Sequence, residues 1–496
     1  MKSVYTDSAL PEKETKIRCH FKEGIMMENA ASALENAVLN YGDTPSVLIL
    51  CGGGNNGGDG LALARKIYGK CRVSVLLVKM PQTEEARAQY ETAKAVGVPF
   101  IDASSAMSEY TVFVDCMFGA GFHGELPPDI LTLLHRVNAA KGIKIACDIP
   151  SGIDKTGCIT TRDDNGSPVA FCADRTITMG ALKTALFSDE AKDFVGVIEK
   201  ADLGVSAAVF EKNSRPDAYL IEECDISLPH RTQKSAHKGM FGHTAVVAGE
   251  KTGAAVIAGT AALQFGSGLV TCVFPENEIP AEKNASFIMS PELMTSSSFP
   301  EKTTSVLLGS GFGTDRTNTL IDTISFICKM KEPAAVLDAD FFSYPECGML
   351  LEKLNSLENA RIIITPHPKE LCSLINTCFG EKNEVSFVAQ HRFEFVHRWS
   401  GRFPNIVLAA KGANTFIAKN SEFFICDCGT NALAKAGSGD VLAGMCAALL
   451  AQKYSALDAA KTAVFAHASA SNGFEPDYAL TPLSLIEKIA YKNHRM

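Results

Sequence analysis

Short apolar segments alternate with helix-like segments along most of the chain, and this alternation restricts the possible folds more than any other feature. In the first half, strands are predicted at 47–51, 73–78, 112–115 and 143–149, and helices at 14–40, 61–68, 84–96 and 130–140. Strands separated by helices are joined by right-handed crossovers, which produce a parallel sheet with helices on both faces. The first half is therefore predicted to be an α/β domain.

The alternation weakens between 202 and 238, where prolines and polar residues are frequent, and then begins again. Further strands are predicted at 244–248, 306–308, 335–337, 362–364 and 406–409, and helices at 254–265, 441–452 and 459–471. A chain of 496 residues is long enough for two large domains. We predict α/β domains over residues 1–215 and 225–496, with a linker near 206–225.

Composition excludes several classes of protein. The formal net charge of −9 argues against nucleic acid as a main partner, because phosphate backbones are bound by basic surfaces. The polar N-terminus and the shortness of the apolar stretch 441–451 predict no signal peptide and no membrane span. The 16 cysteines form no CxxC pair, and Cys426 and Cys428 have no zinc-spaced partners nearby. Buried free thiols and a cytoplasmic location are the expectation.

A glycine-rich segment, 52–60, leaves the first predicted strand and leads into a helix. Glycines let a ligand approach the backbone, and N–H groups at a helix N-terminus attract anions. The segment lacks the lysine of a P-loop, and Asn55, Asn56 and Asp59 replace a standard dinucleotide fingerprint. These side chains favour amide and ribose contacts or a cation held by oxygen atoms. A plain tight turn is the alternative.

Two acidic residues end the next strands at the same predicted edge of the sheet. Asp115 leads into the glycine-containing segment 119–125, and Asp148 leads into 150–154. Ligands of parallel α/β sheets bind outside the carboxyl ends of the strands, so three loops are expected to form one site. Asparagine, aspartate and serine oxygens also suit a hard cation.

In the second half, residues 435–440 (Lys-Ala-Gly-Ser-Gly-Asp) precede a helix rich in small residues. Free N–H groups there would stabilise anionic charge, and Asp440 could act as base on a hydroxyl that attacks a phosphoryl group. A capped core helix is the alternative. Segments 309–313, 338–340, 365–370 and 411–415 also follow strands, which predicts that they converge on one edge.

The N-terminal motifs, Asn-Asn-Gly-Gly-Asp at 55–59, Gly-Ala-Gly at 119–121 and Asp-Ile-Pro-Ser-Gly at 148–152, resemble the NAD(P)H-hydrate epimerase family, which has a Rossmann-like fold. Met26–Ala30, Lys183 and 202–204 resemble its other landmarks. The resemblance implies that Asp148 lies at the nicotinamide end of the substrate, where it is our candidate acid/base group. It implies potassium ligands at Asn56, Asp115 and Ser151. The substrate-binding residues that it implies are Asn55, Asn56, Gly57, Gly58, Asp59, Gly119, Ala120, Gly121, Phe122, His123, Gly124, Glu125 and Asp148.

Residues from about His237 to the C-terminus resemble the ADP-dependent NAD(P)H-hydrate dehydratase family, which has a ribokinase-like fold. The resemblance implies Mg²⁺ carried with ADP, catalysis by Asp440, and a homo-oligomer. It implies hydrate contacts at Ala254, Gly311, His367 and Asp440. Nucleotide contacts are implied at Lys411, Gly412, Ala413, Asn414, Thr415 and Gly439. The chain departs from the family pattern at Ser310, Lys369 and Ser438, and Met117-Phe118 is a departure in the first domain.

Together the two resemblances predict epimerisation of NAD(P)H hydrate and ADP-dependent dehydration of its S form. Two alternatives remain open. The second half could be a kinase of a small alcohol or vitamin precursor, because this fold serves many substrates. The first half could be a nucleotide-binding or interaction module without catalysis.

Overall fold

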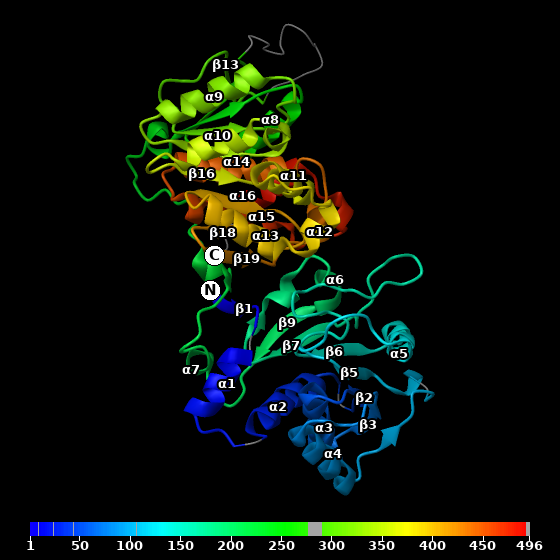
Figure 1. The fold of residues 1–496 in the computed structure, drawn as a ribbon. Coiled ribbons are helices and arrows are strands. Elements are labelled where there is room, and N and C mark those ends of the chain that lie inside the picture. The colour runs from blue at the N-terminus through cyan, green and yellow to red at the C-terminus, as the bar shows by residue number, and fades with distance from the viewer. Residues whose placement is uncertain (8, 23, 43, 106, 276–289, 493–496) are drawn as a thin grey trace. The chain divides into compact units, whose positions relative to one another are not determined.

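The computed structural model describes residues 1–7, 9–22, 24–42, 44–105, 107–275 and 290–492. They form two compact units, Lys2–Ala218 and Tyr219–Met496, with Met1 grouped with the second unit (Figure 1). Both units combine largely parallel sheets with helices, which confirms the predicted α/β class.

The N-terminal unit is built on a seven-stranded sheet in the order β4-β3-β2-β5-β6-β7-β9, in which every pair is parallel. The strands are β2 (Ser46–Cys51), β3 (Arg72–Leu77), β4 (Phe100–Ile101), β5 (Val112–Cys116), β6 (Ile143–Cys147), β7 (Arg175–Met179) and β9 (Val197–Ala201). The strand order reverses between β2 and β5, and such switch points form the ligand crevice of open α/β sheets. Outside this seven-stranded sheet, β1 (Lys2–Tyr5) pairs in parallel with β8 (Leu182–Lys183).

Helices cover both faces of this sheet because alternate side chains of its buried strands point in opposite directions. Val47 and Ile49 of β2 pack in the core on the α2 and α3 side, whereas Leu48 and Leu50 pack with α5. The helices are α1 (Ala9–Arg18), α2 (Ile25–Leu39), α3 (Asn55–Ile67), α4 (Glu84–Val96), α5 (Pro128–Ala139), α6 (Lys192–Val195) and α7 (Ala207–Phe210).

Two helix predictions for this unit need correction. The helix expected over 14–40 is two helices, because Gly24 adopts a left-handed conformation (φ 79°) between them. Helix α3 begins at Asn55 rather than at 61, so Asn55, Asn56 and Asp59 lie in its first turns and not in a loop before it. Glycine disfavours helix interiors, so the residue propensities of this glycine-rich segment argued against a helix that begins at Asn55.

The C-terminal unit has a parallel sheet in the order β13-β12-β11-β14-β15-β16-β17, which continues through β18, β19 and β10. The pairs β17–β18 and β18–β19 are antiparallel. The strands are β10 (Ala218–Leu220), β11 (His243–Val247), β12 (Leu269–Val273), β13 (Met294–Ser296), β14 (Ser305–Leu308), β15 (Ala334–Leu337), β16 (Arg361–Ile364), β17 (Ile406–Ala410), β18 (Thr415–Lys419) and β19 (Glu422–Cys426). The strand order again reverses at a switch point, here between β11 and β14.

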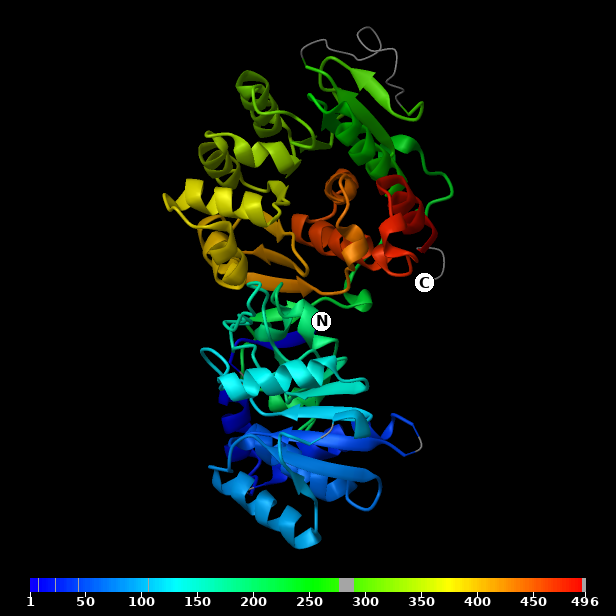
Figure 2. The same cartoon turned by 90° about the vertical axis from the view of Figure 1, so that its right-hand side faces the viewer.

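Helices lie on both sides of this second sheet (Figures 1 and 2). Small residues let α8 and α14 pack closely: a Cβ at Gly444 would lie 2.1 Å from the Ala258 carbonyl oxygen. The helices are α8 (Thr252–Gln264), α9 (Thr317–Lys329), α10 (Cys347–Asn355), α11 (Pro368–Phe379), α12 (Val385–Gln390), α13 (Arg392–Arg402), α14 (Ser438–Ala451), α15 (Ala456–Ser471) and α16 (Pro482–Lys492). The helix predicted from 441 thus begins three residues earlier and includes Gly439 and Asp440.

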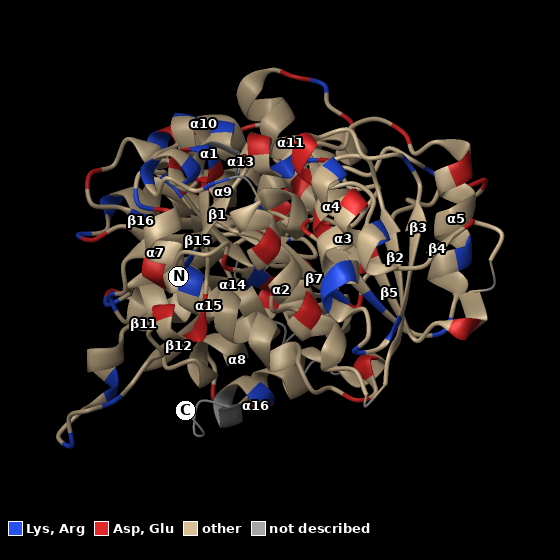
Figure 3. Cartoon of the chain, turned by 90° about the horizontal axis from the view of Figure 1, so that it is seen from below, with Lys and Arg blue, Asp and Glu red and all other residues tan. Residues whose placement is uncertain are grey.

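Basic and acidic residues are interspersed over the described chain (Figure 3). No helix within the described residues combines the length and the apolar character that a membrane crossing requires.

Candidate active sites

A cavity of about 610 Å³ opens at the carboxyl ends of β2 and β5, at the switch point of the N-terminal sheet. A second cavity of about 540 Å³ adjoins it, and both are lined by residues 120–123 and Asp148. The predicted site residues that line the first cavity are Asn55, Asn56, Asp59, Gly119, Ala120, Gly121, Phe122, His123, Glu125 and Asp148. The structure therefore brings most of the first predicted constellation together.

Gly57, Gly58 and Gly124 do not line either cavity. A Cβ at Gly57 would lie 1.9 Å from the Gly52 carbonyl oxygen, and one at Gly58 would lie 2.5 Å from Met27 Cε. Part of the glycine richness is thus explained by close packing of α3 on its neighbours. The sequence alone could not separate this packing from ligand binding.

Asp148 adopts a left-handed backbone conformation (φ 71°), which is uncommon for a non-glycine residue. Its Oδ1 atom accepts hydrogen bonds from the Met179 backbone N–H (3.1 Å) and from Thr178 Oγ1 (3.4 Å), and it lies 2.6 Å from Lys183 Nζ. A Cβ built on Gly119 would lie 3.4 Å from the other oxygen, Oδ2. One carboxylate oxygen is held by the protein, while the other faces the cavity loop.

Asp59 is a second carboxyl group of the first cavity. Its burial, followed by the nearby Asp148 carboxylate, raises its pKa well above the usual value. The Cys147 thiol lies 3.9 Å from Asp59 Oδ2. Two carboxyl groups in one cavity, one of them with a raised pKa, form an arrangement suited to acid–base chemistry.

Asn56, Asp115 and Ser151 converge beside the first cavity. The buried Asp115 carboxylate accepts hydrogen bonds from Ser151 N and Ser151 Oγ, both at 2.7 Å, and burial raises its pKa to about 6. Asn56 Nδ2 donates to the Phe118 carbonyl (2.9 Å). Asn56 Oδ1 is buried and has no hydrogen-bond partner among the described residues. Ser151 Oγ in turn accepts a hydrogen bond from Phe118 N (3.0 Å), so hydrogen bonds through Phe118 link Asn56 to Ser151 and Asp115. A buried, unpartnered amide oxygen and a buried carboxylate linked in this way are the kinds of oxygen ligand that a hard cation takes.

Several charged residues of the first cavity were missed by sequence reasoning, namely Glu12, Lys16, Lys79 and Glu85. Lys79 follows strand β3, so the strand-end rule that selected Asp115 and Asp148 could have found it. Glu12 and Lys16 belong to α1, whose position beside this edge has no sequence pattern of its own.

In the C-terminal unit, Asp440 lies in the first turn of α14. Burial, followed by the charge of Asp338, raises its pKa to about 6, so it is a carboxylate at neutral pH. Lys411 Nζ lies 2.9 Å from the buried Asp338 and 3.4 Å from the position of a Cβ on Gly439. A base, an ammonium group and the helix N-terminus therefore meet at one point, an arrangement that suits phosphoryl transfer.

Residues 411–414 form the turn between the antiparallel strands β17 and β18, and Thr415 begins β18. The buried Arg392 holds this turn from α13 by donating to the carbonyl oxygens of Lys411 (3.0 Å) and Asn414. Arg392 was missed because it is distant in sequence and has no motif. Hydrogen bonds from one side chain of α13 therefore anchor the predicted turn.

The remaining predicted residues, Ala254, Gly311 and His367, differ in what surrounds them. Gly311 adjoins Ala254, whose Cβ would be 2.9 Å from a Cβ on Gly311. His367 caps α11: Nδ1 accepts from the N–H groups of Lys369 and Glu370, and Nε2 lies 3.0 Å from Glu370 Oε1. Its ring is therefore held by its own helix, although 47% of the side chain is exposed.

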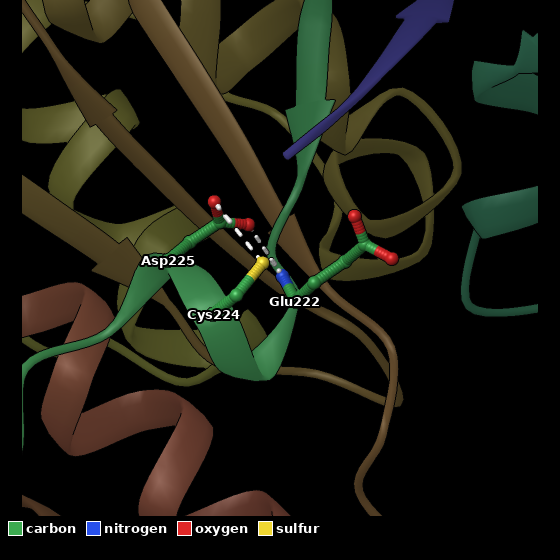
Figure 4. A group of neighbouring side chains, drawn as sticks. All are labelled: Glu222, Cys224 and Asp225. Carbon is green, nitrogen blue, oxygen red and sulfur yellow. Dashed lines mark hydrogen bonds between the residues drawn. The ribbon is translucent and has the colours of Figure 1, made fainter.

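Two other groups of ligand-type side chains have local explanations. Glu222, Cys224 and Asp225 lie within 4.8 Å of one another (Figure 4), but the Met1 ammonium donates to Asp225 (2.7 Å) and the group forms a helix cap. The sulfur atoms of Cys426 and Cys428 lie 3.5 Å apart, and the two residues form no disulfide. Neither group adds to the two sites.

Comparisons with known proteins match both halves of the chain. Residues 23–185 match the family described as YjeF-related protein N-terminus, and residues 244–491 match the NAD(P)H-hydrate dehydratase family. A bifunctional NAD(P)H-hydrate repair enzyme of Helicobacter pylori is 41% identical over 99% of both chains. One of Coxiella burnetii is 30% identical over 90% of this chain and 89% of its own.

Similar solved structures include an ADP/ATP-dependent NAD(P)H-hydrate dehydratase of Bacillus subtilis, at 24% identity and a TM-score of 0.44. It covers 54% of this chain and 94% of its own. The relatives with the same two-part composition, matched over almost their full length, show that this chain belongs to the family of bifunctional NAD(P)H-hydrate repair enzymes.

Proposed function

We propose that this enzyme restores hydrated NADH and NADPH with two active sites, an epimerase in the N-terminal unit and an ADP-dependent dehydratase in the C-terminal unit. The observation that carries the proposal is the 41% identity to a bifunctional repair enzyme across 99% of the chain. The positions of two aspartates also support the proposal, because Asp148 lines the first cavity and Asp440 lies in the first turn of α14. The two activities are complementary, because epimerisation supplies the one epimer that the dehydratase accepts.

For the epimerase, we propose that the hydrated nicotinamide ring occupies the cavity that Asp148 lines. C6 of the hydrate is a carbinolamine carbon, so inversion requires a bond to break there and to form again from the other face. Asp148 Oδ2, which is not held by Lys183, is the oxygen available for proton transfer. Asn55, Asp59 and residues 119–125 would surround the rest of the nucleotide.

Asn56, Asp115 and Ser151 would hold a potassium ion in the epimerase, which is supported by the buried, unpartnered Asn56 Oδ1. The ion would supply a fixed positive charge beside the substrate. We expect Asn56→Ala to weaken the dependence of epimerisation on potassium, measured by replacing K⁺ with tetramethylammonium at constant ionic strength. An equal potassium dependence in the variant and the wild type would reject this ligand.

For the dehydratase, we propose that ADP, carried with Mg²⁺, binds at residues 411–415 and Gly439. Asp440 removes the proton of the C6 hydroxyl, whose oxygen attacks the β-phosphorus of ADP and displaces AMP. The C6–O bond of the phosphorylated hydrate then breaks, phosphate leaves with the electron pair of that bond, and loss of a proton from C5 forms the C5–C6 double bond of NAD(P)H. Ala254, Gly311 and His367 would contact the hydrate.

The test uses purified protein with a mixture of both NADH-hydrate epimers, ADP, Mg²⁺ and K⁺, followed at the absorbance band of the reduced nicotinamide. Full conversion of both epimers, after subtraction of spontaneous epimerisation, is the expected result. Conversion that stops when the S epimer is consumed would reject the epimerase, and no conversion with ADP or ATP would reject the whole proposal. A cytoplasmic homo-oligomer is also expected, and light scattering of the purified protein would test the oligomeric state.

A further inference from the structure

Lys183 is a buried cation whose role the proposed reaction leaves unassigned. Its side chain is only 4% exposed, and its ammonium group lies 2.6 Å from Asp148 Oδ1. The same group donates to Thr178 Oγ1 (3.0 Å) and to the carbonyl oxygens of Met179 (3.0 Å) and Ala181 (3.3 Å). Lys183 Nζ is therefore surrounded by oxygen atoms of the short segment 178–181 and of Asp148.

The position of these oxygen atoms is set by the sheet. Strand β7 ends at Met179, directly beside the end of β6 that leads into Asp148, and Asp148 N donates to the Ile177 carbonyl (2.8 Å). The chain then turns at Gly180 (φ 73°) into β8, whose pairing with β1 aligns Tyr5 with Lys183. The hydrogen bonds of β7 with Asp148 and of β8 with β1 thus fix the backbone position of Lys183.

A buried ion pair is a poor device for stability, because desolvation of the two charges offsets most of their attraction. Apolar residues of similar size would pack this position at least as well. The pair also coincides with a left-handed backbone at Asp148, and strained residues of this kind gather at functional sites. The desolvation of the buried pair and the left-handed backbone both concern Asp148. Both costs are explained if the reaction requires one orientation of the Asp148 carboxylate.

The orientation is specific. Lys183, Thr178 and the Met179 N–H all contact Oδ1, whereas Oδ2 is the oxygen beside Gly119 in the cavity loop. We propose, on the basis of the proposed epimerase function, that Lys183 is a positioning residue. It holds Oδ1 of the Asp148 carboxylate, so that Oδ2 is the oxygen that faces C6 of the hydrate. Lys183 also lines the second cavity, so direct binding of substrate is the competing role.

Kinetics of the full-length protein separate these roles. The rate of conversion of (R)-NADH hydrate to the S form is measured without ADP by chromatography of the epimers, for wild type, Lys183→Met, Lys183→Arg and Thr178→Val. Misplacing a catalytic group by about 1 Å can cost about 100-fold in rate. We therefore expect Lys183→Met to lower kcat by about 100-fold with KM within about threefold, and Lys183→Arg to recover about a tenth of the wild-type rate.

Lys200→Met is the matched control, because it removes a lysine that pairs with Glu211 (2.9 Å) at 17% exposure in the same unit. We expect it to keep kcat within about twofold of wild type, as is usual away from a reacting group. The ADP-dependent dehydration of the S epimer by each variant reports the amount of full-length protein, and a thermal unfolding curve of each variant reports whether the N-terminal unit is folded.

The proposal is overturned if Lys183→Met keeps the wild-type kcat, if it changes only KM, or if Lys200→Met loses as much activity. Should Lys183→Met fail to fold, Thr178→Val decides the question: a lowered kcat at constant KM supports positioning, and an unchanged kcat rejects it. Absence of epimerisation by the wild type itself would reject the epimerase function, and the role of Lys183 would be rejected with it.

Discussion

Asp148 and Asp440 are both aspartates at the ligand edge of a largely parallel sheet, yet their surroundings differ. Asp148 follows a strand, has a left-handed backbone and is paired directly with Lys183. Asp440 lies in the first turn of a helix, and the nearby cation, Lys411, is paired with Asp338 instead. The first carboxylate is oriented by a cation of its own, whereas the second is left with a pKa raised to about 6 by burial and by Asp338.

The largest expected effect separates the two sites completely. Asp440→Asn keeps the size of the side chain but removes the base, so dehydration of (S)-NADH hydrate should fall by about 10²- to 10⁴-fold. Epimerisation by the same protein should be unchanged, because its acid/base group is in the other unit. A variant that dehydrates within tenfold of wild type would remove Asp440 from the reaction.

Lys411→Met tests whether the ammonium group of the second site binds the phosphates of the nucleotide or only neutralises Asp338. Loss of a charge at the phosphate position should lower kcat/KM for ADP by about 30- to 100-fold. The double variant Asp338→Asn/Lys411→Met is the control, because it removes the carboxylate left unpaired in the buried pair. Recovery of the wild-type kcat/KM by the double variant would show that Lys411 only neutralises Asp338.

The raised pKa of Asp440 predicts a pH dependence of the dehydratase. A base must be ionised, and with a pKa of about 6 the ionised fraction is nearly complete at pH 7.5 and about one tenth at pH 5. The dehydration rate at saturating ADP should therefore fall by about tenfold over this interval. ADP affinity is measured at each pH as the control, and a flat profile below pH 6 would contradict the assignment.

The smallest expected effect concerns the turn that Arg392 holds. Lys cannot reproduce the two-pronged donation of a guanidinium group, so Arg392→Lys should loosen residues 411–414 and raise KM for ADP by about three- to fivefold. The kcat at saturating ADP and the epimerase rate should stay at wild-type values. A fall in kcat alone would mean that Arg392 affects the reaction by another route.

Strand ends were the part of both sites that the sequence predicted best. Asp115 and Asp148 lie at one edge of the N-terminal sheet, and Lys411 follows a strand of the second sheet, because parallel neighbours end at the same edge. The α/β class followed from the same alternation of strands and helices. Short antiparallel additions such as β18 and β19 were missed, since they interrupt that alternation.

Contacts between distant segments could not be predicted. The Lys183–Asp148 pair depends on the exact length of the turn between β7 and β8, and Arg392 reaches residues 411–414 from a separate helix. Gly57 and Gly58 were predicted to bind the ligand from the family resemblance, and the structure adds that a side chain at either position would clash with neighbours of α3. Residue type alone does not reveal which neighbour a residue has.

We propose that two separate active sites in one chain act on the two epimers of one substrate, and a mixing experiment tests this directly. Asp148→Asn and Asp440→Asn proteins are combined with both NADH-hydrate epimers, ADP, Mg²⁺ and K⁺, and NADH formation is followed by absorbance. Alone, Asp148→Asn should stop once the S epimer is consumed, and Asp440→Asn should form almost no NADH. The mixture should convert both epimers fully. A mixture in which conversion stops at the S epimer, with no conversion of the R epimer beyond spontaneous epimerisation, would reject the two-site enzyme.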